Sequence, residues 1–309
     1  MRTVSIITTF YNAEMFFGRS IESVLAQRIT DEDLHIEYVV INDQSPDNSL
    51  MVLNDWVAKF KSIHGGDLPK YLDIKVFTPE KNLGCGGARR YGIEHSTGEY
   101  LMFLDADDYY MHNDFVQRAV KTIEETESDI VEYGMLYHGL DGSQQNFTVN
   151  SVMTVNENPE VALLYLFKYN FIKFHVWSKI IRRSIAEQYR YSDKREFEDV
   201  MTIPVWLSLA KKITIMPQIE VNYRAAANSI IRDKMINTRL GTCRAILANF
   251  ERFKQYPNVL IAMYTRAYID ISALMKGKNS LNEGFNEMSQ INTKMLSYIY
   301  PETYQKYTV

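Results

Sequence analysis

The sequence predicts an α/β fold with a mostly parallel central sheet, helices on its faces and a helical extension at the C-terminal end. Two observations predict it. Short β-rich segments alternate with segments of helical periodicity from Val4 to Ile93, which is typical of a parallel sheet covered by helices. From about Arg232 onward the pattern is helical and contains no β-rich run. With 309 residues the chain can bury a large core, in one large domain or two smaller ones.

The N-terminal elements predict where a ligand would bind. Strands are expected over residues 4–8, 36–41, 74–77 and 101–104, and helices over residues 13–27, 49–63 and from the glycines at 84–87 through residue 93. Polar segments follow three of these strands, at residues 9–12, 42–47 and 105–108. Because ligands bind at the carboxyl ends of parallel strands, we expect these three segments to meet at one edge of the sheet.

A glycine-rich stretch precedes the third helix. Gly84, Gly86 and Gly87 would let a backbone approach a ligand closely, and the helix N-terminus would offer free N–H groups, with a phosphate as one candidate ligand. The spacing matches neither a dinucleotide-binding fingerprint nor a P-loop, so both of those folds are disfavoured. No histidine lies near Cys85 in the sequence, so we interpret this residue as a small loop residue.

The second half of the chain continues with mixed elements. Helices are expected over residues 114–127 and 159–168 and from the charged stretch 192–199 through residue 209, and strands over residues 130–137, 146–155, 213–216 and 219–223, with a hairpin turn at residues 138–143. We place a boundary near Ser229. The helices beyond it are expected to pack on the main domain or on a second copy of the chain.

Three carboxylates come directly after the strand at residues 101–104. Asp105, Asp107 and Asp108 would repel one another unless a bound cation or hydrogen-bond donors stabilised them. Magnesium and manganese suit oxygen ligands of this kind. The alternative is that these residues terminate the strand and cap the next helix. For Asp108 in particular, capping is as good an interpretation as ligand contact.

Composition excludes several classes of protein. A formal net charge of -4 gives no general attraction to nucleic acid or anionic membrane. Two cysteines are too few for a disulfide framework, which indicates a reducing compartment. The apolar run after Met1 is too short for a signal peptide, and no segment is apolar enough for a transmembrane helix. We therefore expect a cytoplasmic protein.

Several motifs in a fixed order carry a family resemblance. They are Ile6-Ile7-Thr8-Thr9-Phe10-Tyr11-Asn12, Ile41-Asn42-Asp43-Gln44-Ser45-Pro46-Asp47-Asn48-Ser49, Asn82-Leu83-Gly84 with Ala88-Arg89, Gly98-Glu99-Tyr100 leading into Asp105-Ala106-Asp107-Asp108, Trp177-Ser178-Lys179 with Phe197-Glu198-Asp199, and Tyr223-Arg224 with Asn228-Ser229. In this order they resemble the family 2 glycosyltransferases of the GT-A fold, over about three quarters of the chain. The resemblance implies a GT-A domain at residues 1–229, with a nucleotide-sugar half at about 1–110 and an acceptor half at about 111–229, followed by a helical region at 230–309.

The resemblance also implies an activity and a donor site. The family transfers a sugar from a nucleotide diphosphate, most often UDP, to an acceptor hydroxyl with inversion at the anomeric carbon. The residues that match its donor motifs are Thr9, Phe10, Tyr11, Asp43, Asn82, Arg89, Asp105, Ala106, Asp107, Arg224 and Ser229. Among them, Asp43 and the Phe10-Tyr11 backbone would hold the base, Asp105 the ribose, and Asp107 a manganese or magnesium ion that stabilises the departing diphosphate.

An inverting displacement needs a base on the acceptor side. Asp199 matches the family's base position, at the start of a helix whose N–H groups would hold it, and Glu198 is its rival. For Trp177, acceptor stacking and a place in the core are both open. For Lys179, acceptor binding and a solvated surface position are both open.

The sequence departs from the family pattern in three places. Ala226 stands where the family has a histidine between the motif's arginine and serine, which removes one metal or phosphate contact. Strict metal dependence is therefore in doubt. Thr9 replaces a common proline, and Asn42 replaces the first of two aspartates.

Two other functions remain open at this point. A non-catalytic protein that binds nucleotide sugars on the same fold is favoured by Ala226. A nucleotidyltransferase would share the nucleotide-binding core and the carboxylate-bound metal, but the basic glycine-rich signature expected at the first strand is absent. The acceptor implied by the resemblance is a glycan, a lipid-linked molecule or a protein, and contact of the C-terminal helices with a membrane surface is conceivable.

Overall fold

The computed structural model describes residues 1–225, 235–275 and 283–300. The strands are β1 (Arg2–Phe10), β2 (Leu34–Asn42), β3 (Leu72–Phe77), β4 (Tyr100–Phe103), β5 (Tyr109–Tyr110), β6 (Ile130–His138), β7 (Gln144–Phe147), β8 (Met153–Asn156), β9 (Lys179–Arg182) and β10 (Lys212–Arg224). The helices are α1 (Phe17–Leu25), α2 (Ser49–Ile63), α3 (Gly84–Glu94), α4 (Phe115–Glu125), α5 (Pro159–Phe167), α6 (Arg183–Gln188), α7 (Glu198–Leu209), α9 (Met235–Ala248), α10 (Pro257–Met275) and α11 (Glu283–Ile299), with a 3₁₀ turn at Val176–Ser178.

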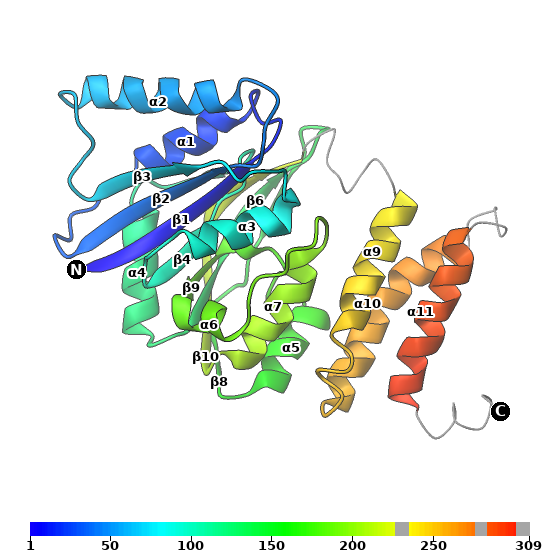
Figure 1. Ribbon diagram of the computed structural model, residues 1–309. Helices are drawn as coiled ribbons and strands as arrows, with labels where there is room; N and C mark the ends of the chain where they lie inside the picture. Colours follow the sequence, from blue (N-terminus) through cyan, green and yellow to red (C-terminus); the bar gives the residue numbers. More distant parts are fainter. Residues whose placement is uncertain (226–234, 276–282, 301–309) are drawn as a thin grey trace.

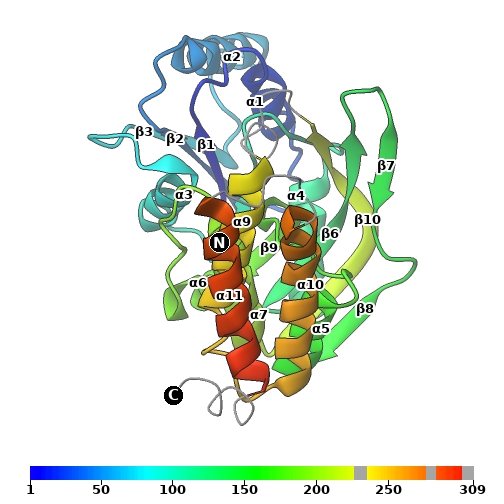
Figure 2. The same cartoon turned by 90° about the vertical axis from the view of Figure 1, so that its right-hand side faces the viewer.

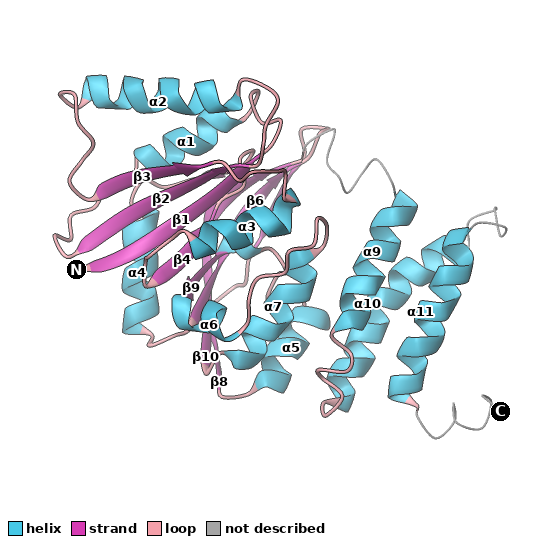
Figure 3. Cartoon of the chain, in the orientation of Figure 1, coloured by secondary structure: helices cyan, strands magenta, loops and turns pink. Residues whose placement is uncertain are grey.

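One mixed sheet runs through the molecule in the order β3-β2-β1-β4-β9-β6-β10-β5 (Figure 3). The strands β3, β2, β1 and β4 are mutually parallel, and β6 and β10 form another parallel pair. Between these groups β9 runs antiparallel to both β4 and β6. The strands β7 and β8 pair with β6 and β10 at the edge that Figure 2 shows on the right. The predicted α/β class, with a central sheet flanked by helices, is confirmed. The sheet is less parallel than predicted, because the pairings of β5, β7, β8 and β9 are all antiparallel.

The parallel strands are covered on both faces. The helices α1 and α2 lie on one face of β1, β2 and β3, and α3 lies on the other (Figure 1). A strand covered in this way reads as an almost continuous apolar run, and residues 36–42 of β2 are all buried. This packing fixes the carboxyl ends of the strands, where the polar segments begin.

The strand β10 corrects one prediction. The sequence indicates two separate extended segments, at residues 213–216 and 219–223, whereas the structure has a single strand from Lys212 to Arg224. Its pairing with β6 shifts register between Ile215 and Val221, around Pro217. Proline cannot donate to a ladder, so the strand forms a bulge there and continues.

The C-terminal helices α9, α10 and α11 stand beside α5 and α7, at the right of Figure 1. Apolar side chains such as Phe250, Phe253 and Met263 are buried among them. The expected boundary near Ser229 falls within residues 226–234, which are outside the described part of the chain. Among the described helices, none has the length and apolar character that crossing a membrane requires.

Candidate active site

Three polar segments lie together at the carboxyl edge of the parallel strands, as the sequence predicts. Phe10 at the end of β1 pairs with Asn42 at the end of β2. On the other side of β1, Ile7 pairs with Phe103, the last residue of β4. The segments that follow these strands therefore start from neighbouring positions in the sheet.

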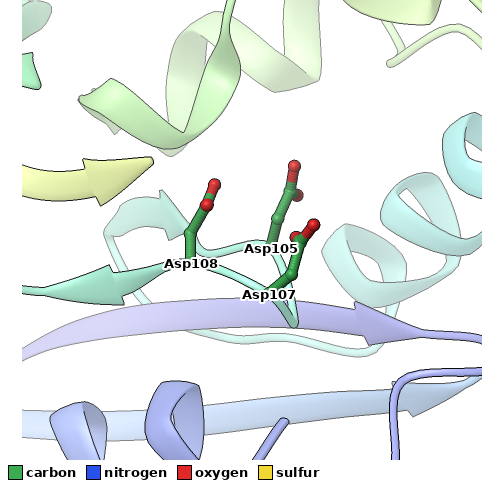
Figure 4. A group of neighbouring side chains, drawn as sticks. All are labelled: Asp105, Asp107 and Asp108. Atoms are coloured by element: carbon green, nitrogen blue, oxygen red, sulfur yellow. The ribbon is translucent and has the colours of Figure 1, made fainter. Parts of the chain in front are cut away.

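The turn after β4 gathers three carboxylates. Carboxylate oxygens of Asp105, Asp107 and Asp108 lie within 4.8 Å of one another, and Figure 4 shows the three side chains on the same side of the turn. Asp108 is fully buried. Its Oδ1 accepts a hydrogen bond of 2.9 Å from the Arg224 backbone N–H, and its Oδ2 is buried without a hydrogen-bond partner.

The alternative of helix capping is wrong for Asp108. The next helix, α4, begins at Phe115, well beyond the acidic turn, and follows Asp114. Instead, Asp108 ties the turn after β4 to the end of β10. A buried carboxylate oxygen without a donor is costly unless a cation or water satisfies it.

The electrostatics of this cluster favour a cation. Burial, followed by the charge of Asp105, raises the pKa of Asp107 to about 6. Burial and the charges of Asp107 and Asp105 raise the pKa of Asp108 well above its ordinary value. A divalent ion would relieve both the repulsion and the unsatisfied oxygen, and carboxylate oxygens are the ligands that magnesium and manganese prefer. The residues present therefore fit a divalent metal.

Arg89 connects the acidic turn to the start of α7. The residue projects from α3 and is 5% exposed. Its Nη2 donates to Asp105 Oδ1 at 2.5 Å, and its Nη1 forms an ion pair with Glu198 and contacts the Tyr191 hydroxyl at 3.3 Å. A guanidinium can serve two carboxylates at once because its donors form a planar fork. Arg89 thus holds the two halves of the site together.

The glycines of α3 have a packing role that corrects the sequence interpretation. A Cβ atom on Gly86 would lie 2.3 Å from the Lys194 carbonyl oxygen and 2.4 Å from that of Ser192. Glycine is therefore needed for the segment before α7 to approach α3. Three of the N–H groups expected to be free for a phosphate at this helix start are also occupied. Leu83 (2.6 Å) and Gly84 (2.9 Å) donate to the Asp43 carboxylate, and Gly86 donates to the Lys194 carbonyl oxygen.

We expect Gly86→Ala to lower the free energy of unfolding by about 1–3 kcal/mol, because the added methyl group has to displace backbone carbonyls that cannot move independently. Urea unfolding followed by tryptophan fluorescence measures this change. A loss within about 0.5 kcal/mol, the range of an ordinary surface substitution, would show that the backbone at residues 192–194 can shift to accommodate the methyl group.

The other described residues that the sequence predicts for donor binding lie around this edge. Asn82 donates to the Asp43 carbonyl at 2.7 Å and accepts from Arg195 at 2.8 Å. Tyr11 is 51% exposed, whereas Phe10 is buried. Thr9 lies within β1, and Ala106 is buried in the acidic turn. The guanidinium of Arg224 rests 4.1 Å from the centre of the Phe16 ring. Ala226 and Ser229 lie outside the described residues.

Glu198 and Asp199, the first two residues of α7, differ in burial and in their partners. Glu198 is buried and paired with Arg89. The side chain of Asp199 is 23% exposed, and its Oδ1 accepts the Val200 backbone N–H at 2.7 Å. Burial, followed by the charge of Glu198, raises the pKa of Asp199 to about 7. A carboxylate that titrates near neutral pH is well matched to accepting a proton.

The structure corrects both interpretations of Lys179. The side chain is completely buried, so it is neither a solvated surface charge nor able to touch an acceptor. Its Nζ donates to the carbonyl oxygens of Lys173 (2.8 Å) and His175 (2.6 Å) and lies 3.2 Å from a Glu132 carboxylate oxygen. Trp177 is 4% exposed and packs against the rings of His175 and Tyr223 rather than being open to solvent.

Two residues at this site could not be identified from the sequence. Tyr191 is buried against Arg89, and His175 lies with its Nδ1 4.0 Å from Asp199 Oδ2. The only sequence signal for His175 is its place two residues before Trp177. Tyr191 gives no signal, because its role depends on contact with α3, about a hundred residues earlier in the chain.

A family model described as glycosyl transferase family 2 matches residues 5–190. The minor teichoic acid biosynthesis protein GgaB of Bacillus subtilis (strain 168) is 25% identical over 227 residues, which cover 71% of this chain and 23% of that protein. The uncharacterized glycosyltransferase EpsJ of the same organism is 31% identical over 191 residues, covering 60% of this chain and 49% of that protein. The chain thus spans less than half the length of these relatives.

Solved structures share the fold. TarS 1–349 of S. aureus, in complex with UDP-GlcNAc, superposes with a TM-score of 0.69 at 16% identity, covering 99% of this chain and 83% of that one. The mannosyltransferase PcManGT from Pyrobaculum calidifontis, in complex with GDP-Man and Mn²⁺, has a TM-score of 0.55 at 14% identity, covering 98% and 87%. At these identities the likeness shows the fold alone.

Proposed function

Since the chain belongs to glycosyl transferase family 2, we propose that it moves a sugar from a nucleotide diphosphate, preferentially UDP, to an acceptor hydroxyl with inversion. The observation that supports the proposal most strongly is that Arg89 connects two acidic sites of different character. One is the acidic turn after β4, which suits a metal and a diphosphate. The other is Asp199, whose raised pKa suits a base.

The donor is proposed to bind along the ends of β1, β2 and β4. Asp43 and the backbone at Phe10 and Tyr11 would contact the base, and Asp105 the ribose. The exposed ring of Tyr11 and the partly exposed carboxylates of Asp105 and Asp107 make this edge accessible. Asn82, which is bonded to Asp43, would help to fix the position of the base-binding segment. TarS, which shares the fold, has been crystallised in complex with UDP-GlcNAc, and a UDP-sugar is therefore the first donor to test.

A divalent cation is proposed to be held by Asp107 and by the unsatisfied Oδ2 of Asp108. When bound, it would supply positive charge that stabilises the departing diphosphate. Arg224 is proposed to leave the Phe16 ring and approach the same phosphates, because its backbone is already bonded to Asp108. Arg224 would then supply positive charge beside the diphosphate in addition to the metal, at a site where Ala226 replaces the family's histidine.

Asp199 is proposed as the base, in preference to Glu198. The carboxylate of Glu198 is buried and paired with Arg89, whereas the side chain of Asp199 is partly exposed and forms no ion pair with Arg89. In the transfer, a bond forms between the acceptor oxygen and the anomeric carbon while the bond to the diphosphate breaks. The electron pair leaves with the diphosphate, and the hydroxyl proton passes to Asp199.

We expect manganese to stabilise the protein through Asp108. A free concentration of 100 times the Kd would add about 2.7 kcal/mol to the free energy of unfolding. The pKa of Asp107, raised to about 6 in the fold, adds a pH dependence. Without metal, stability falls as pH rises from about 4 through 6, because the folded state holds this proton more tightly than the unfolded state. The effect of manganese is therefore larger at pH 8 than at pH 5.

Thermal shift with and without MnCl₂ measures this effect. Asp108→Asn and Asp107→Asn should lose most of the shift, whereas the control Asp114→Asn, an exposed acid in front of α4, should keep it. An equal shift in all three variants and the wild type would place the metal elsewhere.

The function itself is tested by nucleotide release. The purified chain is incubated with UDP-GlcNAc, UDP-glucose or GDP-mannose, with MnCl₂, in water and with added polyols or sugars as acceptors. We expect release from at least one UDP-sugar. Donor binding by calorimetry without any release would instead identify a non-catalytic nucleotide-sugar-binding protein.

A further inference from the structure

The loop between α5 and β9 places an imidazole at the acceptor side of the site. The side chain of His175 is 36% exposed, and its Nδ1 lies 4.0 Å from Asp199 Oδ2. These two atoms come from segments more than twenty residues apart in the chain. Neither the family motifs nor the proposed donor contacts give His175 a role.

Stacked rings fix the plane of this imidazole. The His175 ring lies 4.7 Å from Trp177 at an interplanar angle of 7°. Tyr223 lies 5.2 Å from Trp177 at 14° and 6.0 Å from His175 at 20°. The three rings are therefore nearly parallel, and the buried Trp177 supports the two that are partly exposed. Stacking of this kind restricts rotation of the imidazole.

The buried ammonium of Lys179 fixes the backbone of the same loop. This ammonium group donates one hydrogen bond to the carbonyl oxygen of His175 at 2.6 Å and another to that of Lys173 at 2.8 Å. The Glu132 carboxylate, 3.2 Å away, balances its charge. The imidazole is thus held both in its plane and in its distance from Asp199.

The space between the two side chains suits a hydroxyl group. A separation of 4.0 Å is too long for a direct hydrogen bond. An oxygen atom about 2.8 Å from each atom fits between them. Because Asp199 Oδ1 already accepts the Val200 N–H, Oδ2 is the oxygen left for such a group.

The imidazole is neutral at physiological pH. Partial burial, followed by the positive charge of Lys179, lowers the pKa of His175 to about 4. The other charged groups that act on it are Asp105, Lys173 and Arg89, together with the facing Asp199. A neutral imidazole has one N–H donor, and Nδ1 can carry it.

We propose that His175 and Asp199 together form the subsite for the acceptor hydroxyl. The hydroxyl oxygen accepts a hydrogen bond from His175 Nδ1–H and points its own hydrogen at Asp199 Oδ2. His175 orients the attacking oxygen, and Asp199 takes its proton as the new glycosidic bond forms and the diphosphate leaves. This inference rests on the proposed function, and it assigns the acceptor as an alcohol, of a sugar or a polyol.

Three variants of His175 test the subsite. His175→Phe keeps a ring for the stack and removes both nitrogens, His175→Asn places an amide N–H near the position of Nδ1, and His175→Gln places one near Nε2. Each is assayed for nucleotide release with UDP-GlcNAc, UDP-glucose and GDP-mannose, with glycerol, ribitol or methyl glucoside as acceptor, and for UDP binding by calorimetry.

We expect His175→Phe to lower kcat/KM for the acceptor by about 10- to 100-fold, which corresponds to one lost hydrogen bond in the transition state. Binding of UDP should not change. His175→Asn should recover most of the loss and His175→Gln little of it, which a merely structural role of the ring would not produce.

Two results would overturn the inference and separate it from the proposed function. The first result is a wild type that is active and an Asp199→Asn variant that is not, together with His175 variants that do not behave as expected. Either His175→Phe keeps the full kcat/KM, or all three His175 variants lose it equally. The proposed hydrogen bond from Nδ1 would then be wrong, while the transferase proposal would stand. If the wild type releases no nucleotide from any of the three donors, both proposals fall.

Discussion

Replacing Asp199 by asparagine is expected to lower the rate of sugar transfer by about 10²- to 10⁴-fold, the usual contribution of a general base. Asparagine keeps the shape of the side chain and its hydrogen bond from Val200, but cannot take a proton. Donor binding should change little, since Asp199 belongs to α7 and not to the acidic turn that is proposed to hold the metal and the diphosphate. Steady-state kinetics with saturating donor and calorimetry with UDP measure the two effects.

The pH dependence of the transfer rate of the wild type is an independent test of Asp199 as the base. Because the pKa of Asp199 is raised to about 7, its carboxylate is formed only as pH rises through neutrality. The transfer rate should therefore fall about tenfold per unit as pH drops well below 7. Asp193→Asn is the control, because Asp193 is an exposed acid just before α7 that pairs with Arg90. A transfer rate in Asp199→Asn equal to that of the wild type would move the base to another residue.

Removing the charge of Arg89 is expected to give the largest loss of stability. The guanidinium is buried between Asp105 and Glu198, and Arg89→Met would leave the buried Glu198 without a counter-charge. Breaking one side of a buried ion pair costs about 3–5 kcal/mol in the free energy of unfolding. Chemical unfolding measures the loss.

A neighbouring arginine offers a matched control. Arg90 lies next to Arg89 on α3, but its side chain is 34% exposed and it pairs with Asp193 and Glu94 at the surface. Such pairs contribute about 0–1 kcal/mol, so Arg90→Met should be nearly neutral. Adding Glu198→Gln to Arg89→Met should recover part of the loss. If Arg89→Met lowers the free energy of unfolding no more than Arg90→Met does, the contacts of Arg89 with Asp105 and Glu198 do not stabilise the fold.

Local patterns were sufficient to predict the four parallel strands β1 to β4 and the polar segments that follow three of them. Apolar runs such as Leu101–Leu104, followed at once by acidic residues, mark a buried strand and its end. Parallel strands bring such ends to one edge, so the place of the acidic turn follows from the sequence alone. The alternation of elements likewise predicted the α/β class.

What the sequence could not predict depends on contacts between distant segments. The burial of Lys179 follows from three carbonyl and hydroxyl oxygens of its own loop and from Glu132 on β6. The packing of Gly86 depends on the segment before α7. The capping interpretation of Asp108 failed because its partner is the backbone of Arg224 on β10. None of these contacts leaves a periodic signal in the chain.

The configuration of the product tests the central claim most directly. Proton NMR follows the anomeric signal during turnover of a UDP-sugar by the wild type and by Asp199→Asn. We predict an inverted product: its anomeric configuration is opposite to that of the donor, and it is formed by the wild type and lost with Asp199→Asn. A product that retains the donor's configuration, or one formed at the same rate by both proteins, would contradict it.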